Sequence, residues 1–103
     1  MIRVNVLYQN AEGKKFDMAY YCTKHIPMVK KKLGSACIRV DVDRGLGGAQ
    51  PGSKPAFVAM AHLVFDSAEA FQKAFGPHAD TIMGDIPNYT DIQPLIQLSE
   101  VKM

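Results

Sequence analysis

Three histidines are the side chains of this sequence best suited to move protons near neutral pH. An imidazole titrates near neutrality, so it can serve as a general base, a general acid or a metal ligand. His25 is the main candidate, because Tyr21 stands four residues before it, the spacing of neighbours on a helix surface, and Pro27 follows closely. The same spacing also suits a histidine that only caps or packs a helix, and both interpretations stay open.

The other candidate reactive groups carry weaker signals. His62 stands in an apolar run, where a histidine is typical of the core although it could face a cavity, and His78 follows Gly-Pro and is expected in solvent. Cys22 could act as a nucleophile, but it falls on an apolar stripe, where cysteine behaves as a small hydrophobe. The histidines lack metal-ligand spacing, and no nucleophile-elbow or dinucleotide-binding motif is present. We therefore expect no metal site.

A helix is predicted from Asp17 to Leu33, and it must position His25. Asp17 is a plausible N-cap, and Gly34 follows the last apolar residue as a C-cap. Helical spacing gives an apolar stripe of Ala19, Cys22, Ile26, Val29 and Leu33. A mixed stripe beside it holds Met18, Tyr21, His25, Met28 and Lys32. Pro27 lacks a backbone donor, so we expect a kink or break near His25.

Strand patterns surround this helix. Residues 2–9 and 36–43 alternate between apolar and polar side chains, which predicts half-buried strands, and 56–65 is apolar on both faces, as in a central strand. A last strand is expected over about 90–101. Because Pro94 lies inside it, this strand should be bulged there or lie at a sheet edge. A glycine-rich connector spans 44–53, and a second helix begins at Asp66 or Ser67 and is interrupted at Gly76-Pro77. The order β-α-β-β-α-β predicts an α+β, ferredoxin-like fold: a four-stranded antiparallel sheet with two helices on one face.

Alternation along these strands leaves a mixed set of side chains on the uncovered sheet face. Candidates there for contacting a small organic ligand are Arg3, Asn5, Arg39, Met60, His62 and Gln93. Met28, on the helical stripe of His25, is a further candidate. Apolar residues of the same face are Leu7, Val58, Val64 and Leu95. A monomer rarely exposes a large apolar patch, so we expect a homodimer and a partly polar cavity within each protomer or at the interface.

Composition limits the remaining possibilities. The 103 residues suit one domain, 1–103, and a formal charge of +2 is too small to indicate a nucleic-acid partner. No apolar run approaches the ~20 residues of a membrane span, so no membrane partner is expected. Cys22 and Cys37 do not form a disulfide framework, and the N-terminus reads as a strand with no signal-peptide pattern. These features predict a cytoplasmic protein.

Two segments resemble a known family. The run from Tyr20 to Val29, which contains Tyr21, His25 and Pro27, resembles the Tyr-x-x-x-His-x-Pro segment of the EthD family, named for ethyl tert-butyl ether degradation. The tail from Ile86 to Val101 resembles that family's final turn and strand. The resemblance implies a dimeric α+β barrel, with His25 as the functional histidine and Tyr21 near it. It implies cofactor-free oxygenase or isomerase relatives, with haem a secondary alternative.

Three hypotheses of function follow. In the first, the protein is an enzyme or accessory protein in oxidative degradation, in which His25 moves a proton of an apolar organic compound without a cofactor. In the second, the protein is a non-catalytic carrier of a hydrophobic metabolite. The third, a purely structural dimerisation module, predicts no cavity. The family neighbourhood favours the enzyme.

Overall fold

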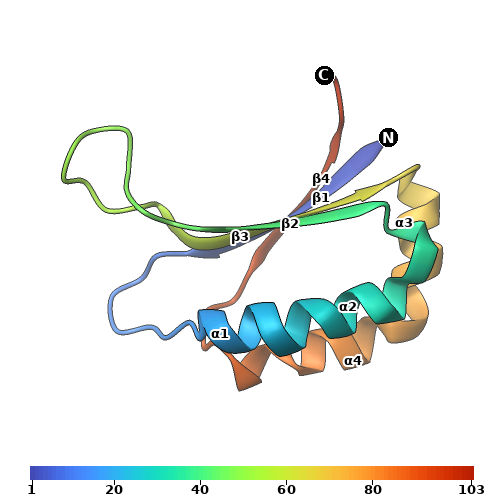
Figure 1. Ribbon diagram of the computed structural model, residues 1–103, viewed down its shortest axis with the longest axis horizontal. Helices are drawn as coiled ribbons and strands as arrows, with labels where there is room; N and C mark the ends of the chain where they lie inside the picture. The colour runs from blue at the N-terminus through green and yellow to red at the C-terminus, as the bar shows by residue number, and fades with distance from the viewer.

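The computed structural model describes residues 1–103 as a twisted sheet with helices packed on one side (Figure 1). The strands are β1 (Ile2–Gln9), β2 (Arg39–Arg44), β3 (Phe57–Phe65) and β4 (Leu95–Glu100). They pair antiparallel in the order β2-β3-β1-β4. The predicted ferredoxin-like α+β fold is therefore confirmed. No helix is both long and apolar enough to cross a lipid bilayer.

Two helical segments cover the sheet. The first contains α1 (Met18–Tyr20), a π-helical turn (Tyr21–His25), α2 (Ile26–Leu33) and a 3-10 turn (Gly34–Ala36). The second contains α3 (Ala68–Phe75), α4 (Ala79–Gly84) and 3-10 turns at Gly76–His78 and Ile86–Asn88. The predicted caps are present: Asp17 Oδ1 accepts from the Tyr20 amide at 3.0 Å, and Ser67 Oγ accepts from the Ala70 amide at 3.0 Å.

The first helix does not break near His25, as the sequence had suggested it could, but widens into the π-helical turn. The Ile26 amide donates to the carbonyl of Tyr21, five residues back. This turn adds a residue to the helical repeat and so shifts the inward face. Tyr21 and His25 are buried, whereas Cys22 is exposed, so the predicted place of Cys22 on the buried stripe is wrong.

β4 lies at the sheet edge, as Pro94 indicates. Three other strand details differ from the sequence prediction. β2 begins only at Arg39, because the residues before it form a 3-10 turn, and β4 begins only after Pro94. Val58 packs against the core and not on the uncovered face, since the β1–β3 register shifts between Tyr8 and Gln9.

The core lies between the sheet and the helices. Strand residues at alternate positions supply one side, and the inward faces of α2 and α4 supply the other. Its buried members include Val4, Leu63, Phe65, Val29, Leu33 and Ile82. This layer also contains the candidate site.

Candidate functional site

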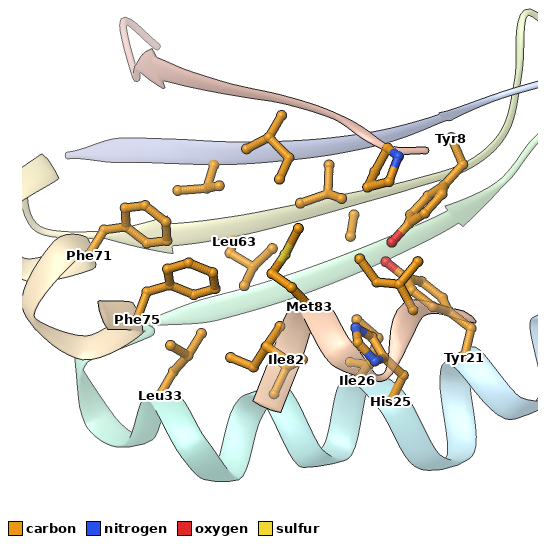
Figure 2. A pocket seen from close by; sticks show the side chains of 17 residues that line it. Tyr8, Tyr21, His25, Ile26, Leu33, Leu63, Phe71, Phe75, Ile82 and Met83 are labelled. Carbon is orange, nitrogen blue, oxygen red and sulfur yellow. The ribbon is translucent and has the colours of Figure 1, made fainter. Parts of the chain in front are cut away.

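A cavity of about 260 Å³ lies inside the layer between sheet and helices (Figure 2). Fifteen of its seventeen lining residues are hydrophobic, and no lysine, arginine or carboxylate lines it. Tyr8, Tyr21 and His25 gather at one end, while Phe71 and Phe75 close the other. The cavity is thus an apolar chamber with its polar groups at a single end.

His25 is the only imidazole in this chamber, and its partners fix its orientation. The residue is 4% exposed, and Nδ1 lies 2.8 Å from Oδ2 of Asp85. An ionised carboxylate can only accept, so the hydrogen of a neutral imidazole belongs on Nδ1. The lone pair is then on Nε2, the nitrogen that faces the tyrosines.

Asp85 is held as an anion at the edge of the site. Its Oδ1 accepts hydrogen bonds from Tyr20 Oη at 2.7 Å and from Asn88 Nδ2 at 2.8 Å. Burial raises the pKa of Asp85, but hydrogen bonds from Asn88, His25 and Tyr20 outweigh it and bring the pKa below the usual range. Asp85 therefore offers a fixed negative charge behind the imidazole.

The electrostatic environment keeps His25 neutral. Burial lowers the pKa of His25, and the hydrogen bond and charge of Asp85 oppose this only partly. Its pKa thus lies below the ordinary value of 6.5. Near pH 7 the ring is a neutral base whose protonated form has a carboxylate partner within hydrogen-bonding distance.

Three tyrosines lie on the Nε2 side of the site, and one of them contacts this nitrogen. The Tyr89 hydroxyl lies 3.4 Å from Nε2 and 2.6 Å from the Tyr8 hydroxyl, and the Tyr21 ring stacks on the imidazole at a centroid distance of 5.4 Å. The hydroxyls of Tyr8 and Tyr21 face each other across the cavity wall (Figure 2). Burial raises the pKa of all three, so they remain protonated hydrogen-bond donors.

In this cavity the structure brings together two of the residues that the sequence singled out. His25 and Tyr21 line the cavity, whereas Met28 packs against the core without lining it. Gln93 is exposed in the segment before β4, beside a shallow depression near the end of the second helical segment.

The remaining candidates lie on the opposite, uncovered face of the sheet. Across this face Arg3 and Arg39 both pair with Val64, which lies between them, Asn5 pairs with His62, and Leu7 pairs with Met60. His62 Nδ1 lies 2.8 Å from Asn5 Oδ1, and Nε2 lies 3.2 Å from Asp43 Oδ2. Arg3, Asn5, Arg39 and His62 line a polar hollow on this face, which the sheet separates from the cavity of His25, so their role as ligand contacts stays a prediction.

Three functional groups escaped the sequence analysis. Asp85 and Tyr89 stand 60 and 64 positions beyond His25, so no local spacing could pair them with the histidine. Tyr8 belongs to an alternating strand pattern that does not mark it as a site residue. No group of three or more His, Cys, Asp or Glu side chains is arranged to hold a metal ion.

Comparisons with known proteins agree with this fold. An EthD-like protein from Ralstonia eutropha JMP134 shares 54% identity, with a TM-score of 0.95 over 99% of this chain and 92% of its own. An ethyl tert-butyl ether degradation (EthD) family protein from Bacillus halodurans C-125 shares 19% identity, with a TM-score of 0.66 over 98% of both chains.

More distant structures share the fold. A protein from Shewanella loihica PV-4, provisionally described as a monooxygenase, has 8% identity and a TM-score of 0.61 over 99% of this chain and 94% of its own. No curated protein matches the chain significantly. The family model for the EthD domain matches residues 12–93. The chain therefore belongs to the EthD family.

Proposed function

We propose that this protein is an enzyme that binds a small apolar organic molecule in the cavity and removes a proton from it with Nε2 of His25. The observation that carries the proposal is a buried, neutral imidazole held by Asp85 at the only polar end of an apolar chamber. Membership in the EthD family and the fold shared with a provisional monooxygenase support oxidation or isomerisation as the reaction.

Cavity size indicates the size of the substrate. A cavity of about 150 Å³ suffices for benzene. The chamber here measures about 260 Å³, which suits a molecule of roughly two fused rings. The absence of charged lining groups favours an uncharged ligand, since nothing in the wall would compensate a buried charge.

The proposed proton transfer needs only groups that the chain supplies. Nε2 accepts a proton from an acidic C–H or O–H of the substrate, and the Asp85 carboxylate stabilises the resulting imidazolium. Isomerisation is completed when the same proton returns to another carbon. Oxidation requires O2 as co-substrate: a CH2 group becomes a carbonyl with one oxygen atom, and the other leaves as water. The proposal includes no cofactor.

The test uses 2-tetralone, a bicyclic ketone with acidic protons beside its carbonyl. Proton NMR in D2O follows deuterium exchange at these positions. We expect the protein to accelerate exchange, and His25→Ala to reduce the acceleration about 100-fold or more. His78→Ala, a histidine outside the cavity, should keep the wild-type rate. Unchanged exchange in His25→Ala, with the fold intact by circular dichroism, would rule out His25 as the base.

A carrier protein is the second candidate function, and the apolar character of the cavity favours it to the same degree. A carrier would bind 2-tetralone at micromolar concentration without exchange and would tolerate His25→Gln. The exchange assay therefore separates the two functions, because binding is common to both and proton transfer is not.

We also propose that two copies pair through the uncovered sheet face. Leu7, Met60 and Leu95 form an apolar row across it, and Leu95 is 48% exposed in the single chain. Burial of this row against a second copy would remove it from water.

A further inference from the structure

The Tyr89 hydroxyl lies between two possible acceptors. Its oxygen is 2.6 Å from Tyr8 Oη and 3.4 Å from His25 Nε2. A hydroxyl carries a single hydrogen, so Tyr89 can donate to only one of them at a time. Tyr89 is 3% exposed and does not line the cavity, whereas Tyr8 and His25 do. The hydrogen-bond chain Tyr8–Tyr89–His25 can therefore run in two directions.

The two directions leave different groups free. In the first, Tyr8 donates to Tyr89 and Tyr89 donates to Nε2, so the lone pair of the imidazole is occupied. In the second, Tyr89 donates to Tyr8, the hydrogen of Tyr8 can turn to the Tyr21 hydroxyl or to a ligand in the cavity, and the lone pair of Nε2 is free. Asp85 holds the hydrogen on Nδ1 in both, so Nε2 remains the acceptor throughout.

An empty apolar cavity favours the first direction. The second would leave the Nε2 lone pair without a partner in an apolar chamber, whereas the Tyr8 hydrogen can turn to the Tyr21 hydroxyl beside it, and an unpaired polar group carries a free-energy penalty. A ligand with an acceptor oxygen beside Tyr8 offsets this penalty, because the Tyr8 hydrogen gains a carbonyl partner. Such a ligand therefore shifts the population toward the second direction.

We propose that Tyr8 is a carbonyl-binding group of the cavity, and that a ligand carbonyl accepting its hydrogen bond reverses the chain and frees Nε2 of His25. The ligand class is an uncharged ketone or quinone of about bicyclic size, since no charged side chain lines the cavity. The inference deepens the proposed function, because the freed nitrogen is the proposed base. Tyr8 contacts the ligand, and Tyr89 is a positioning residue that acts through His25.

The arrangement couples substrate recognition to basicity. The base becomes free when a carbonyl occupies the subsite, and the same Tyr8 hydrogen bond would strengthen as negative charge develops on the carbonyl oxygen during deprotonation. A hydrocarbon of equal size would fill the chamber without reversing the chain.

The experiment is nitrogen-15 NMR of His25 at pH 8, with 2-tetralone as the probe and tetralin, which has no carbonyl, as the matched control. The signal of an unprotonated imidazole nitrogen moves to higher frequency when it loses a hydrogen-bond donor. We expect 2-tetralone, but not tetralin, to move the Nε2 signal this way. We also expect 2-tetralone to bind about five- to tenfold more tightly than tetralin, the value of one hydrogen bond.

Two variants test the direction of the hydrogen-bond chain Tyr8–Tyr89–His25. In Tyr89→Phe, the Nε2 signal should already lie at the higher frequency of a nitrogen without a hydrogen-bond donor before any ligand is added. 2-Tetralone should then move it no further than tetralin does. In Tyr8→Phe, Tyr89 keeps Nε2 as its acceptor, so 2-tetralone should not move the signal and should lose its advantage in affinity. A purely structural role for either tyrosine would produce neither pattern.

Equal responses of wild-type Nε2 to 2-tetralone and tetralin, or a wild-type response in Tyr89→Phe, would overturn the inference, as would failure of both probes to bind. These results are distinguishable from failure of the proposed function. If the hydrogen-bond chain reverses but no deuterium exchange occurs, the carbonyl subsite is supported and the catalytic role of His25 is not. If exchange depends on His25 while the Nε2 signal stays fixed, the catalytic role is supported and the reversal is not.

Discussion

At the scale of single residues, the chemistry of the site depends on how Asp85 and burial act on one imidazole. Burial disfavours the charged ring, and the carboxylate favours it, with burial the larger effect. The result is a base that is free of its proton near pH 7 yet has a stabilising partner once it accepts one. Neither effect alone would give both properties.

Asp85→Asn should lower the pKa of His25 further, because it removes the hydrogen bond and the charge that raise this pKa. Proton NMR titration of the imidazole measures it. Asp43→Asn, which replaces a carboxylate beside His62 on the other sheet face, is the matched control and should leave the His25 titration unchanged. A rise of the His25 pKa in Asp85→Asn would contradict the assigned role of the carboxylate.

Stability should also fall in mild acid because of His25. Its pKa is lower in the folded than in the unfolded chain, so the unfolded state binds more protons as the pH drops below about 6.5, its ordinary value. Stability is therefore fully present above that pH and is lost as the pH falls toward the folded pKa. Urea unfolding between pH 7.5 and pH 5.5 should show a smaller loss for His25→Gln than for the wild type; equal losses would mean that His25 is not buried in its neutral form.

At the scale of elements, the π-helical turn decides which residues reach the cavity. The sequence predicted the helix, both caps and a disturbance near Pro27, and these predictions depend on local chemistry. It could not predict that the disturbance would be a wider turn, so a regular 100° repeat assigned Cys22 to the buried stripe. Tyr21, whose carbonyl accepts the Ile26 amide, lies on the buried face in its place.

Gly34 ends the first helix in a conformation that other residues avoid, with φ of +62° and ψ of −149°. Gly34→Ala should destabilise the fold by about 1–3 kcal/mol in urea unfolding. Gly84→Ala is the matched control, because Gly84 lies at the end of α4 without a positive φ and a Cβ there meets nothing within 4 Å. It should stabilise the fold by up to about 1 kcal/mol. A similar effect of both substitutions would contradict the role of Gly34 in ending the helix.

At the scale of the whole molecule, the sheet divides the chain into two chemically different faces. The strand alternation predicted both faces, and it assigned Arg3, Asn5 and His62 to the uncovered one. The alternation could not show that the apolar cavity with His25 lies on the helical side. That depends on how the second helical segment packs, and on the long-range contact that brings Asp85 to His25.

Pairing of two copies through the uncovered face is tested by native mass spectrometry. We expect the wild type to have the mass of two chains and Leu95→Lys to have the mass of one, because the substitution places a charge in the apolar row. Gln72→Lys, on the exposed side of α3, should keep the wild-type mass. A single-chain mass for the wild type would show that the apolar row is solvated. The same spectrum reports any bound haem as added mass.

We propose neutral His25, which faces an apolar cavity, as the base of the reaction. The pH dependence of deuterium exchange into 2-tetralone tests this role. We expect the enzymatic rate to rise through a single pKa below 6.5 and to be level above pH 7, and His25→Ala to remove this component. An enzymatic rate that increases in proportion to hydroxide, or one that survives in His25→Ala, would contradict it.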